Sequence, residues 1–267
     1  MGTPIGNLSD FSERGKQTLE NADFIAAEDT RVTAKLLNKF SIKKPLVSYY
    51  EHNRRERGEI IVSKILSGEN CALVTDAGMP CISDPGQDLV RLCRERGIAV
   101  ESVPGPTAFA TALAVSGMEC GRFTFEGFLS VNKPGRKEHL AELKNETRTM
   151  IFYEAPHKLK ATLKDLYECF SDREIAVVKE LTKIHESVMR TTLKQAVEYF
   201  ENETPKGEYV LIVAGAKKDE KKQPVTLLQA VMTARELVAS GMSVNEAAKT
   251  AAAQTGIKKS AIYKELV

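Results

Sequence analysis

The chain has 267 residues, of which 42% are hydrophobic and 28% are charged, so it can bury a sizeable core and is long enough for two compact domains. Its formal net charge of +2 neither requires nor excludes a polyanionic partner. No apolar run reaches the roughly 20 residues that a membrane-spanning helix needs, and the first residues lack the apolar segment and cleavage site of a signal peptide. We therefore expect a globular, cytoplasmic protein.

The first ten residues, MGTPIGNLSD, predict a loop that leads into a helix. Asp10 and Glu13 have the spacing of a helix cap and its partner. A loop of this kind normally leaves the carboxyl end of a parallel strand, yet only Met1 and Gly2 precede it. The first strand of the expected sheet is therefore largely absent from this position.

Residues 1–116 alternate short apolar runs with helical patterns. The runs are FIAA, LVSYY, CALVTD and VESVP, and a segment of helical periodicity follows each of them. This alternation predicts a parallel sheet with crossover helices, and hence a first α/β domain over residues 1–116. Asp84 and Pro85 have the residue types of a helix cap and a first helical residue, so we expect a helix to begin there.

The pattern changes after residue 116. EIAVVKELT and HESVMRTTL are strand-like runs without a helix between them, which predicts a mixed sheet and a second α/β domain over residues 117–216. Residues 217–225 read as a charged linker, and residues 226–267 predict a tail of three short helices. The expected fold is therefore α/β, with two domains and a small helical tail.

The tail has the pattern of a helix-turn-helix. Ser243 and Glu246 are spaced as a capping box, Gly256 interrupts the helical pattern, and KKSAIYKELV predicts a short basic helix. This pattern suits nucleic-acid binding. A packing or dimerisation module is the alternative, because helix pairs of this kind carry no function by themselves.

Polar segments, or segments rich in Gly and Pro, follow the four expected strands of the first domain. These segments begin at Glu28, Glu51, Asp76 and Pro104. Because the carboxyl ends of parallel strands meet at one edge of a sheet, we expect a ligand cleft there. None of the segments is a P-loop or a G-x-G-x-x-G turn, so a phosphate cradle is not predicted. Their small and apolar residues, with few cations, suit a positively charged ligand with an apolar or aromatic body.

A series of motifs then identifies a resemblance. In chain order between residues 3 and 215 they are TPIGNLSD, AAEDTR, SYYEHN, ALVTDAGMPCISDPG, VPGPTA, FEGFL, FYEAPHKL, ELTKIHE and GEYVLIVAG. With these motifs the chain resembles the bacterial small-subunit ribosomal RNA methyltransferases of the tetrapyrrole methylase-like group. The resemblance implies two α/β domains with S-adenosylmethionine in the cleft between them, usually in a homodimer. It also implies methyl transfer to the ribose 2′-hydroxyl of a cytidine in the decoding region of 16S ribosomal RNA, with the RNA or the assembled 30S subunit as substrate.

The resemblance assigns cofactor contacts to both domains. They are Pro4, Ile5, Asp76, Gly78, Met79, Ile82, Thr107 and Ala108 in the first domain, and Tyr153, Glu154 and Val210 in the second. Apolar residues such as Met79 and Ile82 are alternatively plain core residues. Their place in a loop rich in Gly and Pro favours the role in the cleft.

The reaction needs a group that accepts the proton of a weakly acidic hydroxyl. Glu28 is the first candidate, because it ends a strand that faces the cleft and the resemblance matches it to a catalytic carboxylate. The other candidates are Asp29, His52, His157 and Glu180. Alternatively, Glu28 and Asp29 form an ion pair with Arg31 or cap the helix at Thr30.

An in-line methyl transfer needs no metal, and no metal site is expected. The cysteines form neither a C-x-x-C pair nor a cluster with His, so we interpret them as reduced packing residues. They are Cys71, Cys81, Cys93, Cys120 and Cys169.

Clusters of basic side chains are candidates for RNA phosphate contacts, which position a protein without reading sequence. The candidates are Arg54, Arg55, Lys133, Arg136, Lys137, Lys258 and Lys259. A solvated surface is the alternative for each cluster. Two other functions also remain open. One is a methylase of the same fold that acts on a small corrin-type substrate, and the other is a nucleic-acid-binding protein without catalysis.

Overall fold

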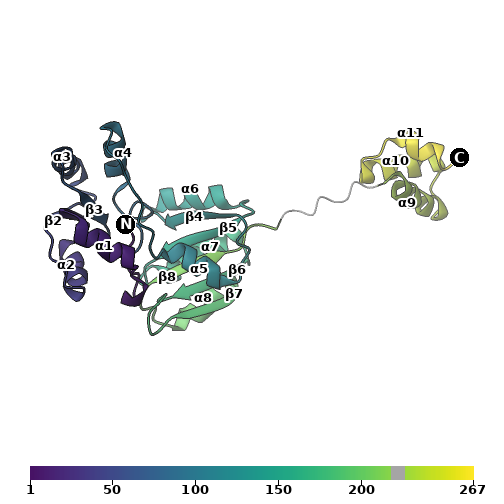
Figure 1. Cartoon of the computed structure of the whole chain (residues 1–267). Coiled ribbons are helices and arrows are strands. Elements are labelled where there is room, and N and C mark those ends of the chain that lie inside the picture. The colour runs from purple at the N-terminus through teal and green to yellow at the C-terminus, as the bar shows by residue number, and fades with distance from the viewer. Residues whose placement is uncertain (218–225) are drawn as a thin grey trace. The chain divides into compact units, whose positions relative to one another are not determined.

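The computed structural model describes residues 1–217 and 226–267, in two compact units, Met1–Ala216 and Lys217–Val267 (Figure 1). All of the predicted linker except Lys217 lies outside the described residues. No helix in the two described stretches is both long enough and apolar enough to cross a membrane.

The first half of unit 1 contains a three-stranded parallel sheet. Its strands are β1 (Phe24–Ala27), β2 (Leu46–Ser48) and β3 (Cys71–Val74), in the order β2-β1-β3. Every residue of β1 is buried, because this strand is central in the sheet and helices cover both of its faces. The run FIAA, apolar at each position, is typical of such a strand.

Two pairs of helices form the layers around this sheet. Helices α1 (Glu13–Asn21) and α2 (Thr30–Lys39) pack on one face, and α3 (Arg54–Leu66) and α4 (Gln87–Glu95) pack on the other (Figure 1). The side chains of β1 alternate between these layers, since Ile25 and Ala27 share a core with α1 and α2, whereas Phe24 and Ala26 share one with α3 and α4. Helices therefore cover both faces of a parallel sheet, and the sequence had predicted a parallel sheet with crossover helices.

Residues 100–104 were predicted as a fourth strand, and this prediction is wrong. Gly2 N donates to Val103 O over 3.0 Å, and the Met1 ammonium donates to Leu73 O over 2.8 Å. The residues before the first loop therefore connect β3 to residues 100–104, at the place where a strand was expected. A strand needs a continuous ladder of backbone partners, and a stretch as short as Met1–Gly2 cannot supply one.

The starts of two helices also differ from the prediction. Ser12, rather than Asp10, caps α1, and its hydroxyl accepts a hydrogen bond from Gly15 N over 3.0 Å. Helix α4 begins after Gly86, which has a φ of 145°, so Asp84 and Pro85 lie in the preceding loop. A Cβ at Gly86 would lie 2.6 Å from Cys81 Sγ, so the fold of this loop requires glycine there.

The second half of unit 1 contains a mixed sheet in the order β4-β5-β8-β6-β7. Its strands are β4 (Phe123–Phe128), β5 (Thr149–Glu154), β6 (Glu174–Lys179), β7 (Ser187–Thr192) and β8 (Tyr209–Val213). Strands β4 and β5 are parallel and the other pairs are antiparallel. The central strand β8, YVLIV, is buried at every position. Together the two sheets confirm the predicted α/β fold class.

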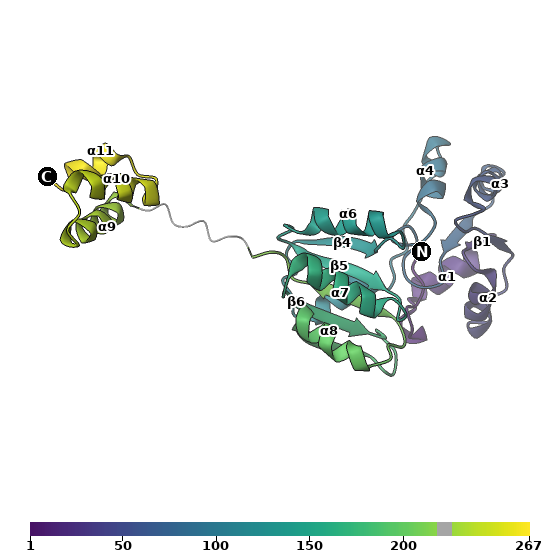
Figure 2. The ribbon, with the colours of Figure 1, turned by 180° about the vertical axis from the view of Figure 1, so that it is seen from behind.

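Helices cover both faces of this second sheet. Helices α6 (Lys133–Leu143), α7 (Leu159–Phe170) and α8 (Leu193–Asn202) lie over one face (Figure 2), and α8 was not predicted. Helix α5 (Ala108–Ser116) packs on the opposite face, where Ala112 and Leu113 share a core with residues of β5, β6 and β8. Although α5 was expected to belong with the first domain, its packing joins it to the second sheet.

Unit 2 is a bundle of three helices, α9 (Leu227–Ala239), α10 (Val244–Thr255) and α11 (Lys259–Lys264), which confirms the predicted helical tail. Its core is small and rich in alanine, with Ile262 of α11 fully buried. Ser243 caps α10 by accepting from Glu246 N over 3.3 Å, and its hydroxyl donates to the Glu246 carboxylate over 2.7 Å. The predicted capping box is thus half formed, because the carboxylate binds the Ser243 hydroxyl instead of the Ser243 amide.

Candidate functional site

A cavity of about 550 Å³ lies in unit 1, where the loops after β3 meet the carboxyl ends of β4 and β5. This volume is within the range of about 300–1,000 Å³ that is typical of small-molecule sites. Both halves of the unit contribute to its wall. The residues of the wall that the sequence had singled out as cofactor contacts are Ile5, Gly78, Met79, Ile82, Thr107, Ala108, Tyr153, Glu154 and Val210.

Close backbone packing joins the loops on the first side of the cavity. Thr3 and Gly78 exchange two backbone hydrogen bonds, of 2.9 and 3.1 Å. Gly78 has a φ of 83°, and a Cβ added to it would contact the Ile5 side chain at 3.5 Å. A Cβ at Gly105 would lie only 2.8 Å from Gly2 Cα. The first loop is therefore held between the loop after β3 and the segment that leads into α5.

Aromatic side chains form the second side of the cavity. The Tyr153 ring makes edge-to-face contacts with the rings of Phe125 and Phe128, whose centroids lie 5.0 and 5.5 Å from its own. Its hydroxyl accepts a hydrogen bond from Phe109 N, in the first turn of α5, over 3.0 Å. Burial raises the pKa of the Tyr153 phenol, so the phenol is neutral near neutral pH. Phe128 is 58% exposed although it lines the cavity, so it extends the apolar wall to the surface.

Three carboxyl groups gather beside the cavity. Glu28 Oε2 accepts a hydrogen bond from Asp76 N over 3.4 Å, and Asp76 Oδ1 accepts one from Asp29 N over 3.1 Å. Asp84 lines the cavity itself. Burial raises the pKa of Glu28, Asp76 and Asp84, and the negative charges of Asp84 and Asp76 raise that of Glu28 further. This mutual repulsion favours a cationic ligand, which would relieve it.

Asp29 has a structural role that the sequence had left as an alternative. It caps α2 by accepting from Arg31 N over 2.8 Å, and its carboxylate pairs with the Arg31 guanidinium at 2.6 Å. These hydrogen bonds lower the pKa of Asp29 to about 2. A carboxylate of so low a pKa is a weak proton acceptor, which favours the role of Asp29 as a helix cap over that of a base.

The remaining catalytic candidates and two of the assigned cofactor contacts lie in different places. His157 is exposed and lines the cavity. The Glu180 carboxylate pairs with Lys183 at 2.9 Å, which lowers its pKa. Pro4 and Asp76 are not part of the cavity wall, because the chain turns toward it only at Ile5 and at Ala77.

Sequence reasoning missed several residues of the wall. They include Ser83, Asp84, Phe128, Val178 and Leu181. The position of Asp84 inside DAGMPCISDPG was a usable signal, but the dipeptide with Pro85 favoured a helix cap instead. Val178 and Leu181 gave no signal, since their run reads as an ordinary buried strand.

The basic residues predicted to contact RNA differ in their surroundings. Arg54 pairs with Glu51 and with Asp88, each at 3.0 Å. Arg136 is the least accessible of them, because its side chain is only 13% exposed and its guanidinium is bound to Asp165 at 2.5 Å. The other predicted contacts are exposed. They are Arg55, Lys133, Lys137, Lys258 and Lys259.

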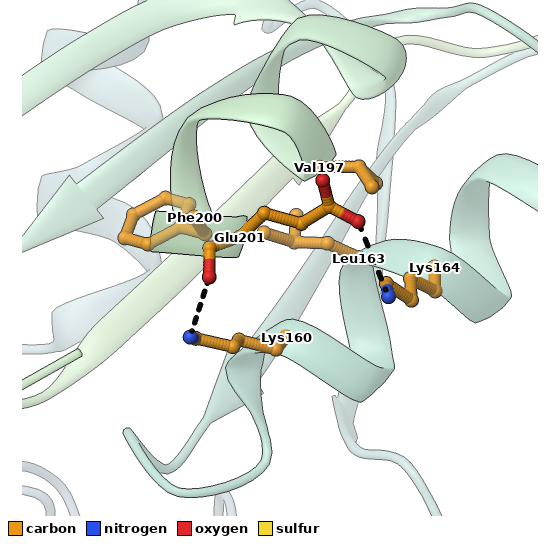
Figure 3. A pocket seen from close by; sticks show the side chains of 6 residues that line it. All are labelled: Lys160, Leu163, Lys164, Val197, Phe200 and Glu201. Atoms are coloured by element: carbon orange, nitrogen blue, oxygen red, sulfur yellow. Dashed lines mark hydrogen bonds and ion pairs between the residues drawn. The ribbon is translucent and has the colours of Figure 1, made fainter. Parts of the chain in front are cut away.

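A smaller cavity of about 90 Å³ lies between α7 and α8 (Figure 3). The Lys160 ammonium donates to Glu201 O over 3.1 Å, and Lys164 pairs with the Glu201 carboxylate at 3.6 Å. Both ammonium groups are therefore engaged with α8, and the cavity is too small for a nucleoside-sized ligand. Within residues 1–217 and 226–267, no three His, Cys, Asp or Glu side chains are grouped as they would be around a metal ion.

Residues 1–197 match the family model of the Tetrapyrrole (Corrin/Porphyrin) Methylases. Among solved structures, a cobalt precorrin-4 methyltransferase of cobalamin biosynthesis superposes with a TM-score of 0.59 at 20% identity, over 80% of this chain and 92% of its own. Diphthine synthase superposes with a TM-score of 0.60 at 12% identity, over 79% and 87%. At these identities the two structures establish the fold alone.

Two relatives named ribosomal RNA small subunit methyltransferase I are much more similar in sequence. The protein of Synechocystis sp. is 45% identical over 98% of this chain and 94% of its own length, and that of Halalkalibacterium halodurans is 44% identical over 98% and 92%. The match therefore includes the tail as well as both sheets. The chain belongs to the tetrapyrrole methylase family and, within it, to the family of ribosomal RNA small subunit methyltransferase I.

Proposed function

We propose that the cavity binds S-adenosylmethionine and that the protein transfers its methyl group to the ribose 2′-hydroxyl of a cytidine in the decoding region of 16S ribosomal RNA. By its family, the chain is an S-adenosylmethionine-dependent ribosomal RNA methyltransferase. The observation that carries the proposal is the cavity wall. It brings together, from both halves of the unit, nine residues that the family resemblance had assigned to the cofactor.

The wall fits this cofactor in size, polarity and charge. Ile5, Leu181 and Val210 offer an apolar surface to an adenine ring. Asp84 lines the same cavity, and its charge interacts with those of Glu28 and Asp76. This group of carboxylates suits the positive charges of a sulfonium and an ammonium group. The cofactor supplies an electrophilic methyl group, so the protein has to hold the acceptor oxygen in line with it and to accept a proton.

Glu28 is the proton acceptor in this proposal. The raised pKa of its carboxyl group makes the ionised form a stronger base than an exposed glutamate. The negative charge of Asp84, which lines the cavity, acts on Glu28, although Glu28 itself is not part of the wall. His157, on the exposed rim of the cavity, is the second candidate.

Exposed cations support an RNA substrate. Lys133 and Lys137 lie on α6, Arg55 lies on α3, and Lys258 and Lys259 lie at the start of α11 in the tail. Such residues contact phosphates without reading sequence, so the nucleotide is selected by other features of the RNA or the ribosomal subunit. We also propose that the protein is a homodimer, which sedimentation tests, and that it acts in the cytoplasm.

The test uses 30S subunits and 16S RNA from a bacterial strain that lacks the corresponding gene. The purified protein and labelled S-adenosylmethionine are incubated with each substrate, and the modified nucleotide is located by its resistance to alkaline cleavage. We expect one cytidine to carry a 2′-O-methyl group. Calorimetric binding of S-adenosylmethionine without methylation of either substrate would contradict the RNA assignment. A corrin-type precursor serves as the control acceptor and should receive no methyl group.

A further inference from the structure

A chain of hydrogen bonds connects α6 with the wall of the cavity. Arg136 Nη2, on α6, donates to the Thr162 hydroxyl of α7 over 2.8 Å. Thr162 Oγ1 donates in turn to Glu154 Oε2, at the end of β5. Glu154 Oε1 accepts a further hydrogen bond from Ala155 N over 2.8 Å. Because Glu154 and Ala155 both line the cavity, the chain runs from the back of the wall to the cavity itself.

The chemistry of the groups fixes the direction of this chain. A guanidinium group can only donate, so the Thr162 oxygen accepts from Arg136 and its single hydrogen is free to bind the carboxylate. Hydrogen bonds arranged in series polarise one another, so the arginine strengthens the bond that Thr162 makes to Glu154. Arg136 Nε is meanwhile bound to Asp165 Oδ2 at 2.5 Å, which fixes the plane of the guanidinium.

Burial makes the carboxylate dependent on these partners. Thr162 is fully buried and Glu154 is 4% exposed. A buried carboxylate is costly unless hydrogen bonds and an opposite charge compensate its lost hydration. Arg136, itself 13% exposed, provides that charge through Thr162. Removing the hydroxyl would leave Glu154 Oε2 without this partner, and the carboxylate would have to turn away from its place.

We propose that Arg136 and Thr162 are positioning residues for the cofactor. Through Glu154 they hold the Ala155 amide, and with it the segment Ala155–His157 of the cavity wall, in the conformation that binds S-adenosylmethionine. This inference rests on the proposed cofactor site. Arg136 acts from behind the wall and contacts neither the cofactor nor RNA.

The test compares two substitutions of Thr162. Thr162→Val removes the hydroxyl at nearly the same shape, whereas Thr162→Ser keeps the hydroxyl and removes a methyl group. We expect the dissociation constant of S-adenosylmethionine, measured by calorimetry, to rise about tenfold in Thr162→Val and to stay within about threefold of wild type in Thr162→Ser. Equal binding by Thr162→Val and wild type, or equal loss in both variants, overturns the proposal.

Arg136→Met interrupts the same chain one step further from the cavity. It should weaken cofactor binding to a similar extent, and the double variant with Thr162→Val should bind no more weakly than either single variant. Additive losses would contradict a shared chain. If Arg136→Met does not fold, the comparison of Thr162→Val with Thr162→Ser still tests the proposal.

Lys137→Met is the matched control, because Lys137 is the exposed neighbour of Arg136 on the same helix. It should leave cofactor affinity unchanged and reduce the salt dependence of RNA binding, whereas Arg136→Met should leave that salt dependence unchanged. A reduced salt dependence in Arg136→Met would make Arg136 a phosphate contact and overturn the inference. Failure of the wild-type protein to bind S-adenosylmethionine would instead refute the proposed function.

Discussion

Gly105→Ala tests whether the close approach of two loops forms the cofactor cavity. A Cβ at Gly105 would lie 2.8 Å from Gly2 Cα and 2.9 Å from Gly2 C, which are backbone atoms that no rotamer change can move. The two backbones would have to separate by about 0.6 Å to reach the 3.4 Å of an ordinary contact. That shift would strain the hydrogen bond from Gly2 N to Val103 O, which is 3.0 Å long, and would move Ile5 at the cavity wall.

Overpacking of this kind destabilises a protein by about 1–3 kcal/mol. For a unit of this size, a loss of about 2 kcal/mol lowers Tm by about 4–8 °C. We expect differential scanning calorimetry to record such a fall, and titration calorimetry to record about tenfold weaker binding of S-adenosylmethionine.

Gly121→Ala is the matched control. Apart from its two neighbours in the chain, no described residue has an atom within 4 Å of a Cβ built at Gly121, and the backbone there is not left-handed. Its effect on stability should stay within about 0.5 kcal/mol. Equal Tm and equal cofactor affinity in Gly105→Ala and Gly121→Ala would refute the reasoning, because the predicted clash would then have no consequence.

Three further predictions follow from the carboxyl groups and the tail. Glu28→Gln should retain cofactor affinity and lower the methylation rate. In the wild type, the methylation rate should fall as pH decreases through a pKa above the 4.5 of an ordinary glutamate, because the base must be ionised. A Glu28→Gln variant with the wild-type rate would exclude Glu28 as the base. Burial disfavours the ionised form of Glu28 in the folded protein. The stability that the protonated carboxyl group contributes is therefore lost as pH rises through its raised pKa. At pH 7, Glu28→Gln should not lower Tm. Asp84→Asn should weaken binding of S-adenosylmethionine more than Asp76→Asn, because only Asp84 lines the cavity, and titration calorimetry on both variants would show the reverse order if the wall were misassigned. Removal of residues 217–267 should leave unit 1 folded and able to bind the cofactor, while methylation of RNA becomes slower and less dependent on salt. A truncated protein that sediments as a monomer while the full chain is a dimer would assign the tail to assembly instead.

The local pattern of the sequence was enough to predict most elements of the fold. FIAA is apolar at each position because β1 is covered on both faces, so a periodicity argument finds it. The loop residues of the cavity were also accessible, because Gly78 and its neighbours stand between a buried strand and a helix. Helix α8 lies between the strand-like runs HESVMRTTL and GEYVLIVAG, in a segment to which no element was assigned.

Which residues come into contact depends on how the elements pack in three dimensions. Residues 100–104 are strand-like in sequence, but a strand forms only beside a sufficiently long partner, and here that partner is Gly2. Arg136 belongs to a basic cluster in the sequence, yet the packing of α6 on α7 buries it against Asp165 and Thr162. Asp84 has the residue type of a helix cap, but the fold places it in the cavity wall, where its charge acts on Glu28. Periodicity in the sequence indicates which face of an element is buried. Contacts between residues far apart in the chain depend on how the elements pack. For this reason the helices and strands were largely predictable from the sequence, whereas the full set of residues in the site depends on the fold.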